Sequence, residues 1–172
     1  ELIVPIRNPT DKTDSFIKEI LNNTTYTNFH ITLIIRKIEF NELKFTKKFI
    51  SSKDQLACHL TPTGTKFVDE INDFVDEISA DYIGILTPNL VGFSPGWLEV
   101  LISQAHQNKI GAVAPKLLNQ NGSVFSNGII LTPDYKVHRL FREKIDDQGY
   151  FGWGILRKGY AALSEECIVI KR

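Results

Sequence analysis

Hydrophobic and polar positions follow two alternating patterns along this chain. Short runs rich in Val, Ile and Leu occupy residues 2–6, 30–35, 56–60, 82–86, 111–118, 123–131 and 161–170. Longer stretches with helical spacing lie between several of them. The run 30–35 is almost continuously apolar, as expected of a strand covered on both faces. This alternation predicts an α/β sandwich with a mostly parallel sheet, and an antiparallel hairpin around Asn121-Gly122 toward the C-terminal part.

Three helices are expected between these strands. Residues 67–78 carry apolar side chains on one face and five acidic residues on the other, which is typical of a solvated face. Ser94 and Pro95 predict a helix start with Ser94 as the cap, and Asp14 is expected to cap an earlier helix. The lysine-containing stretch 39–52 fits either a poorly defined helix or a loop, and residues 133–159 are predicted to be loop.

Composition restricts the class of protein. The chain has 172 residues with 20 Lys and Arg against 20 Asp and Glu, which suits one globular domain over 1–172 and argues against nucleic-acid binding. No apolar run approaches the roughly 20 residues of a transmembrane helix. Cys58 and Cys167 lie in apolar segments, which predicts buried thiols in a reducing, cytoplasmic compartment. The chain begins within a predicted strand and without Met, so we expect an excised part of a larger protein.

Most catalytic motifs are absent from the sequence. It contains no phosphate-binding loop, no dinucleotide-binding glycine motif, no nucleophile elbow and no zinc-ligand spacing. In open α/β sheets, ligands bind beyond the carboxyl ends of the strands. The polar residues expected there suit phosphate or hydroxyl recognition, and they are Arg7, Asn8, Arg36, Thr87 and Asn89.

The segment 80–131 resembles the family 2 glycosyltransferases, especially their rhamnosyltransferase-like branch. The matching residues are Asp81-Tyr82, Pro95-Gly96-Trp97-Leu98-Glu99, Gly111-Ala112-Val113, Lys116-Leu117-Leu118, Asn121-Gly122 and Gly128. Weaker likeness extends to Val4-Pro5-Ile6-Arg7-Asn8, Asn28-Phe29-His30-Ile31, 149–152 and 167–169, so nearly the whole chain is covered.

The resemblance implies a GT-A fold that transfers a sugar from a nucleotide-diphosphate sugar to a glycan or other hydroxyl acceptor. Membrane association, if present, would come through the rest of the parent protein. The donor-binding residues that the resemblance implies are Pro5, Arg7, Asn8, Arg36, Asn72, Thr87, Asn89 and His138. Active members of the family hold Mg²⁺ or Mn²⁺ through a D-x-D-like motif, which matches Thr87-Pro88-Asn89-Leu90 here, so Asn89 is the one candidate metal ligand.

The sequence differs from the family in the residues for metal binding, for recognition of the nucleotide base and for catalysis. Asn89 offers a neutral amide oxygen where the family has a carboxylate. Arg36 stands where the family tends to have an acid that accepts a hydrogen bond from the base, and a guanidinium only donates. The catalytic base of the family matches positions beyond Arg172, and the Asp146-Asp147 pair is interpreted as a surface feature.

Two other interpretations stay open from the sequence. One is a catalytically inactive glycosyltransferase-like module with a binding or scaffolding role. The other is an unrelated Rossmann-type or response-regulator-like domain. This sequence lacks the phosphate-loop glycines and the acidic cluster at the strand ends that such domains have. Trp97 is expected in the core, whereas Trp153 lies in a Gly-rich loop where it could stack on a sugar or a partner. The sequence does not indicate an oligomeric state.

Overall fold

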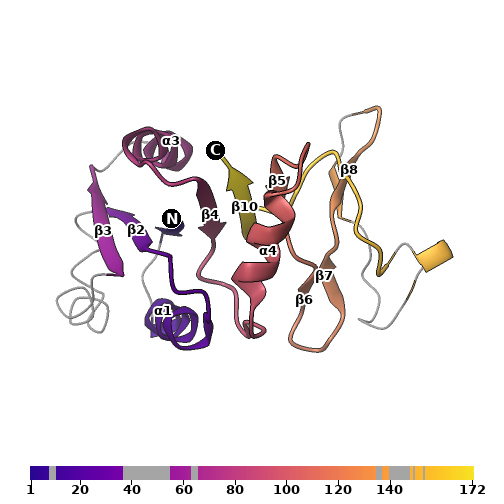
Figure 1. Ribbon diagram of the computed structural model, residues 1–172, viewed down its shortest axis with the longest axis horizontal. Helices are drawn as coiled ribbons and strands as arrows, with labels where there is room; N and C mark the ends of the chain where they lie inside the picture. The colour runs from indigo at the N-terminus through magenta and orange to yellow at the C-terminus, as the bar shows by residue number, and fades with distance from the viewer. Residues whose placement is uncertain are drawn as a thin grey trace. The chain divides into compact units, whose positions relative to one another are not determined.

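The computed structural model describes residues 1–7, 11–36, 55–62, 66–134, 137–139, 148, 150–152 and 154–172 (Figure 1). The side chains of residues 11, 67, 137–139 and 150 are outside this description. Contacts between residues group the chain into two compact units: unit 1 is residues 1–112 and 165–172, and unit 2 is residues 113–164. No linker in the sequence marks this division, so a single domain over 1–172 stays a prediction.

A six-stranded sheet forms the centre of unit 1, with strand order β3-β2-β1-β4-β10-β5. Strands β1, β2, β3 and β4 run parallel, and β10 pairs antiparallel with β4. The bounds are β1 Leu2–Ile6, β2 Ile31–Arg36, β3 Leu56–Thr61, β4 Tyr82–Leu86, β5 Ala112–Val113 and β10 Cys167–Lys171. The predicted α/β class with a mostly parallel sheet is therefore confirmed.

The central strands are buried because helices cover both faces of the sheet. All five residues of β1 and the first five of β2 are buried, as their continuous apolar sequences predict. Helices α1 (Asp11–Asn23) and α3 (Phe67–Glu77) lie on opposite sides of the sheet (Figure 1). Phe74 of α3 joins Ile3, Ile34 and Ile83 in one buried cluster.

Helix α4 (Trp97–Ala105) packs on β10 and buries Leu98, Leu101 and Ala105. Its start corrects the prediction, because Gly96 at φ +70° is the residue before the helix and the Ser94 side chain does not cap it. The Ser94 carbonyl instead accepts a hydrogen bond from the Trp97 amide at 3.1 Å. Asp14 is likewise no cap, since α1 begins three residues earlier at Asp11.

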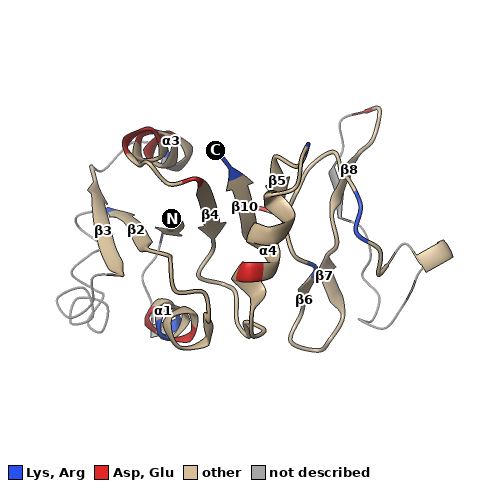
Figure 2. Ribbon diagram, viewed as in Figure 1, with Lys and Arg blue, Asp and Glu red and all other residues tan. Residues whose placement is uncertain are grey.

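The acidic face of α3 is not uniformly solvated. Figure 2 shows acidic residues gathered on this helix, and Asp69, Asp73, Asp76 and Glu77 are exposed. Glu70 is only 4% exposed, while the apolar Val68 is 62% exposed. The helical phase of the buried stripe is therefore shifted toward Glu70 at the first turn, which corrects the predicted apolar face at that end.

Unit 2 consists of two small antiparallel pairs and a short 3₁₀ helix. Strand β6 (Leu117–Leu118) pairs with β7 (Val124–Ser126), and β8 (Ile129–Leu131) pairs with β9 (Val137–Arg139). The 3₁₀ helix η2 covers Tyr150–Gly152. The predicted turn at Asn121-Gly122 is confirmed, with Gly122 at φ +80° and Asn121 Oδ1 accepting from the Ser123 amide.

Four elements predicted between residues 111 and 170 differ from the structure. The expected strand 111–118 is two strands in different sheets, because Pro115 between them has no amide hydrogen to donate to a ladder. The expected strand 123–131 is divided before Gly128, whose φ is +98°. The region 133–159 contains β9 and η2 rather than loop alone, and the last strand begins at Cys167 rather than residue 161.

Candidate functional site

Two arginines lie at adjoining strand ends in unit 1. Ile6 pairs with Ile35 in the parallel register of β1 and β2, so Arg7 follows β1 beside Arg36, the last residue of β2. Neighbouring strands are about 4.8 Å apart. Arg7 is exposed and Arg36 is half-buried, which brings two permanent positive charges to one edge of the sheet.

The same edge continues through β4 and β10. Thr87 follows β4, and its amide donates to the carbonyl of Glu166 at 3.0 Å. Because β10 is antiparallel and begins at Cys167 opposite Leu86, Glu166 lies beside Thr87. The Thr87 hydroxyl is buried, and within the described part of the chain it neither donates nor accepts a hydrogen bond. Across four neighbouring strands the edge therefore presents Arg36, Arg7, Thr87 and Glu166.

Sequence reasoning missed Glu166. It placed the last strand from residue 161, which would put Glu165 and Glu166 inside a strand instead of before it. The acidic pair directly ahead of the apolar run Cys167-Ile168-Val169-Ile170 is the signal that could have moved the strand start. The structure leaves Glu165 exposed and Glu166 half-buried.

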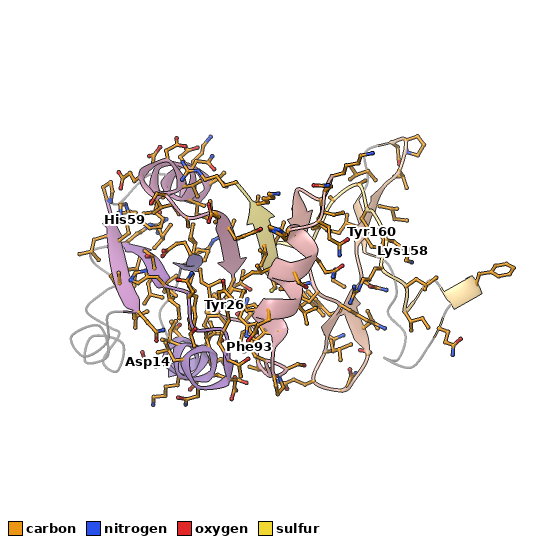
Figure 3. All side chains as sticks on the ribbon, viewed as in Figure 1. Asp14, Tyr26, His59, Phe93, Lys158 and Tyr160 are labelled. Atoms are coloured by element: carbon orange, nitrogen blue, oxygen red, sulfur yellow. The ribbon has the colours of Figure 1, made fainter. Side chains whose placement is uncertain are left out.

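The loop from Thr87 to Gly96 is held against α1. Thr87 to Leu90 form a turn in which the Leu90 amide donates to the Thr87 carbonyl at 3.3 Å, leaving Asn89 exposed. The Gly92 amide donates to Glu19 Oε1 at 2.7 Å. The Phe93 ring lies 5.9 Å from that of Phe16 in α1 and 5.1 Å from that of Trp97 (Figure 3).

A second polar contact fixes the start of α4 beside α1. Trp97 Nε1 donates to Thr24 Oγ1 at 3.1 Å, directly after the end of α1. Thr25 Oγ1 donates to Glu99 Oε1 at 2.6 Å. These contacts and the aromatic packing of Phe93 join the second half of the loop and the start of α4 to α1 and the two residues after it. Trp97 is half-buried rather than in the core, which corrects the prediction made for it.

The residues at this turn do not fit a resident divalent cation. Mg²⁺ and Mn²⁺ favour several oxygen ligands that include carboxylates. The segment 87–92 contains no Asp or Glu and therefore no carboxylate. Asn89 contributes a single neutral amide oxygen. Among the residues that the structure describes, no three His, Cys, Asp or Glu side chains form a group that could hold a metal. Arg7 and Arg36 place two positive charges at the neighbouring strand ends.

The other predicted site residues are more scattered. Pro5 is buried within β1, and Asn72 is exposed in the second turn of α3. His138 belongs to β9 in unit 2, where only its backbone is described. Asn8 lies outside the described residues. The segment 39–52, Asp146, Asp147 and Trp153 do as well, so the predictions made for them stay untested.

A cavity of about 360 Å³ lies at the opposite edge of the sheet. Its lining includes Glu1, His30, Asp81 and Tyr82, which lie at the amino ends of β1, β2 and β4. Glu1 Oε1 is 3.0 Å from His30 Nδ1 and accepts from Thr32 Oγ1 at 2.7 Å. His30 is thus a partnered residue directly before β2. This cavity does not coincide with the arginine edge.

The two cysteines are free thiols; Cys167 is buried as predicted, whereas Cys58 is only half-buried, which corrects the prediction for that residue. Burial raises the pKa of the Cys58 thiol to about 12 and that of Cys167 to about 12. Thiols with such pKa values hold their protons at neutral pH and make poor nucleophiles. His59, next to Cys58, packs its ring 5.0 Å from that of Phe74, so this region is part of the α3 packing (Figure 3).

Within the residues that the structure describes, no helix has both the length and the apolar character needed to cross a bilayer.

No protein-family model matches the chain. Two curated proteins align with 99% of it: the uncharacterized protein y4gI of Sinorhizobium fredii, 21% identical over 173 residues, and the O-antigen biosynthesis protein RfbC of Myxococcus xanthus, 22% identical over 175 residues. The chain spans only 19% and 14% of the length of these relatives.

Solved structures share the fold at low sequence identity. A mannosyltransferase, PcManGT from Pyrobaculum calidifontis in complex with GDP-Man and Mn²⁺, has a TM-score of 0.57 and 13% identity, covering 69% of this chain and 35% of that one. The 4-diphosphocytidyl-2C-methyl-D-erythritol synthase from Anaerococcus prevotii has a TM-score of 0.54 and 11% identity, covering 99% and 68%. The chain therefore has the GT-A-like α/β fold found in glycosyltransferases and nucleotidyltransferases.

Proposed function

We propose that unit 1 binds a nucleoside diphosphate sugar at the edge formed by Arg7, Arg36 and Thr87, as the donor-binding part of a glycosyltransferase. The observation that carries the proposal is the pairing of Arg7 and Arg36 at adjoining ends of β1 and β2. A guanidinium fork matches the oxygens of a phosphate with two parallel hydrogen bonds. Two such forks can bind the two phosphates of one diphosphate.

In this proposal, donor binding does not depend on a metal ion. Asn89 cannot supply the charge that anchors a cation, whereas both guanidinium groups remain charged throughout the physiological pH range. Arg7 and Arg36 therefore offset the negative charge of the diphosphate when the donor binds. The arginine pair would hold the leaving diphosphate in a role that the D-x-D-bound cation has in the family.

The remaining groups at the edge supply contacts to the rest of the donor. The Glu166 carboxylate can accept hydrogen bonds from ribose or sugar hydroxyls. Arg36 can donate to a carbonyl of the base but cannot accept from an imide. Asn8, Asn72, Asn89 and His138 stay predicted donor contacts.

The relatives support a glycan acceptor. The name of RfbC refers to O-antigen biosynthesis, and the mannosyltransferase structure contains GDP-Man. We infer transfer of the donor sugar to a glycan hydroxyl, with the proton leaving that hydroxyl for a carboxylate base. We assign no residue of this chain to that base.

Calorimetric titration of the 172-residue chain with UDP, GDP, dTDP and their sugars, each with and without Mn²⁺, tests the proposal. We expect one nucleotide class to bind with the same affinity in both conditions. Arg7→Gln and Arg36→Gln should each weaken binding about tenfold or more, the usual loss for a hydrogen bond between charged groups. Arg157→Gln in unit 2 is the control and should bind like the unaltered chain.

Two results would overturn this proposal. The first is the absence of binding to every nucleotide in both conditions. The second is binding that neither Arg7→Gln nor Arg36→Gln weakens. A strict requirement for Mn²⁺ would contradict the part of the proposal that assigns the charge of the diphosphate to the arginines.

One observation favours a second candidate, a module that binds the donor without transferring its sugar. The turn Thr87-Pro88-Asn89-Leu90 has no carboxylate, and the described residues hold no metal-binding group. Nucleotide binding at the arginine edge, combined with no sugar transfer by the longer parent protein, would identify this candidate. Transfer by the parent that Arg36→Gln abolishes would exclude it.

A further inference from the structure

Unit 2 exposes an unusual cluster of large apolar side chains in the segment 151–156. Phe151 is 80% exposed, and Ile155 and Leu156 are each 57% exposed. We call these three residues the apolar tip. Phe151 also has a left-handed backbone, at φ +50° and ψ +37°, a conformation that disfavours a bulky side chain. A large aromatic residue is thus held in solvent at a conformational cost.

Hydrogen bonds fix the backbone of this segment. The amides of Ile155 and Leu156 both donate to the Gly152 carbonyl at 3.1 Å, and the Gly154 amide donates to the Gln148 carbonyl at 2.7 Å. The Gly154 carbonyl accepts from Lys116 Nζ and from Asn127 Nδ2, each at 3.1 Å. The backbone polar groups of this segment are therefore hydrogen-bonded within unit 2, while the side chains of Ile155 and Leu156 extend into solvent.

Basic residues follow the apolar tip directly. Arg157 is exposed, and the Lys158 ammonium lies 5.5 Å from the centre of the Tyr160 ring (Figure 3). Residues 113–164 contain seven Lys and Arg against four Asp and Glu, a formal charge of +3, whereas the rest of the chain carries −3. The apolar tip therefore belongs to the positively charged part of a chain that is neutral as a whole.

We propose that the apolar tip, together with Arg157 and Lys158, docks unit 2 on the surface of a membrane that contains anionic lipids. Aromatic and aliphatic side chains insert at the boundary between headgroups and acyl chains, and Lys and Arg beside them meet the lipid phosphates. The positive charge of unit 2 complements an acidic lipid surface, whereas a lipid surface without net charge does not attract it. This inference is independent of the arginine edge in unit 1.

Co-sedimentation of the 172-residue chain with vesicles tests the proposal. We expect binding to phosphatidylcholine vesicles that contain 30 mol% phosphatidylglycerol, and much weaker binding to phosphatidylcholine alone. Arg157→Gln/Lys158→Gln should reduce the partition coefficient about 30-fold, which corresponds to about 1 kcal/mol for each basic residue. Ile155→Ser/Leu156→Ser should reduce it at least tenfold.

Matched variants in unit 1 control for general loss of charge or apolar surface. Val68→Ser/Val100→Ser removes two exposed apolar residues, which are 62% and 50% exposed. Lys66→Gln/Lys109→Gln removes two exposed lysines. Both double variants should bind vesicles like the unaltered chain. Circular dichroism of every variant reports on folding, and nucleotide titration reports on donor binding by unit 1. A failure of the membrane proposal can therefore be distinguished from a failure of the donor-binding proposal.

Three outcomes would overturn the proposal. One is the absence of binding to the anionic vesicles at low salt. Another is equal loss of binding in the unit 1 controls. The third is concentration-dependent self-association, measured by sedimentation velocity, that Ile155→Ser/Leu156→Ser abolishes while vesicle binding stays undetectable; the apolar tip would then be a protein interface.

Discussion

At the residue scale, Gly128 is constrained by its backbone and by its surroundings at once. Its φ is +98°, and a Cβ placed on it would lie 2.5 Å from atoms of the Tyr160 ring. Left-handed backbone disfavours other residues, and overpacking in a well-filled site typically costs 1–3 kcal/mol. The position therefore fixes how the start of β8 meets the segment that contains Tyr160.

We predict that Gly128→Ala lowers the free energy of unfolding by about 2 kcal/mol or more, because the methyl group must displace an aromatic ring and the backbone is strained. Urea denaturation followed by fluorescence measures the change. Gly111→Ala is the control, since no atom lies within 4 Å of a Cβ there and its φ is not positive. Equal stability of the two variants would contradict this account of Gly128.

The cysteines give a second prediction at this scale. With the pKa of each thiol raised to about 12, we expect both to react slowly with a thiol reagent at pH 8 and at once after addition of urea. Cys167→Ala should leave one slow thiol. Rapid reaction of both thiols in the folded chain would contradict these raised pKa values.

The same pKa values determine the sign of a pH effect on stability. Above about pH 9 the unfolded thiols lose their protons while the folded ones keep them, so the folded state binds more protons. The free energy of unfolding should therefore fall as the pH rises from 9 toward 12, by up to about 1.4 kcal/mol per pH unit for Cys167. Urea titrations at pH 8 and pH 10 measure it, and Cys167→Ala should show a smaller fall.

Single residues also show where sequence reasoning ends. The turn at Asn121-Gly122 and the burial of Cys167 were predictable because local conformation and polarity decide them. The burial of Glu70 and the place of Glu166 beside Thr87 were not, because each depends on which element packs against it. An antiparallel strand inserted next to β4 leaves no local pattern in the sequence.

At the element scale, the loop after β4 is positioned by α1 rather than by its own sequence. Glu19 accepts from the Gly92 amide, Phe93 packs between Phe16 and Trp97, and Trp97 donates to Thr24. The strand and helix bounds on either side were predictable to within a few residues from apolar periodicity. The path of the loop was not, since those contacts join residues about 70 positions apart.

A double-mutant cycle on Trp97 and Thr24 tests this anchoring. We expect Trp97→Phe to destabilise the chain by more than the loss of ring area alone, with a coupling energy of about 1 kcal/mol to Thr24→Val, the usual contribution of one hydrogen bond. Urea denaturation of the four proteins measures it. A coupling energy near zero would show that the indole hydrogen bond does not hold the loop.

At the scale of the whole molecule, the chain divides into a sheet-centred unit 1 and a smaller unit 2 of short hairpins. The sequence predicted the fold class well because unit 1 consists of long apolar strands and amphipathic helices. It predicted unit 2 poorly, because two- and three-residue strands carry little periodicity. The same contrast applies to the two proposed sites. The arginine edge could be predicted from the order of the strands, whereas the apolar tip could be found only from the exposure of its side chains in the structure.

We expect the two units to differ in cooperativity. Gly128→Ala should increase amide hydrogen exchange in β6, β7 and β8, because the strain lies in unit 2, and leave the amides of β1 and β2 as protected as before. Hydrogen exchange followed by mass spectrometry measures both sets of peptides in one experiment. A uniform loss of protection across the chain would show that it unfolds as one cooperative unit.

The central claim is that the arginine edge binds a nucleoside diphosphate, and mapping by NMR tests it most directly. The backbone amide signals of the 172-residue chain would be followed during titration with the best-binding nucleotide, without added metal. The account predicts the largest shifts at Arg7, Arg36 and residues 87–90. Shifts confined to Glu1, His30 and Tyr82, around the cavity at the opposite edge of the sheet, would contradict it, as would no shifts at all.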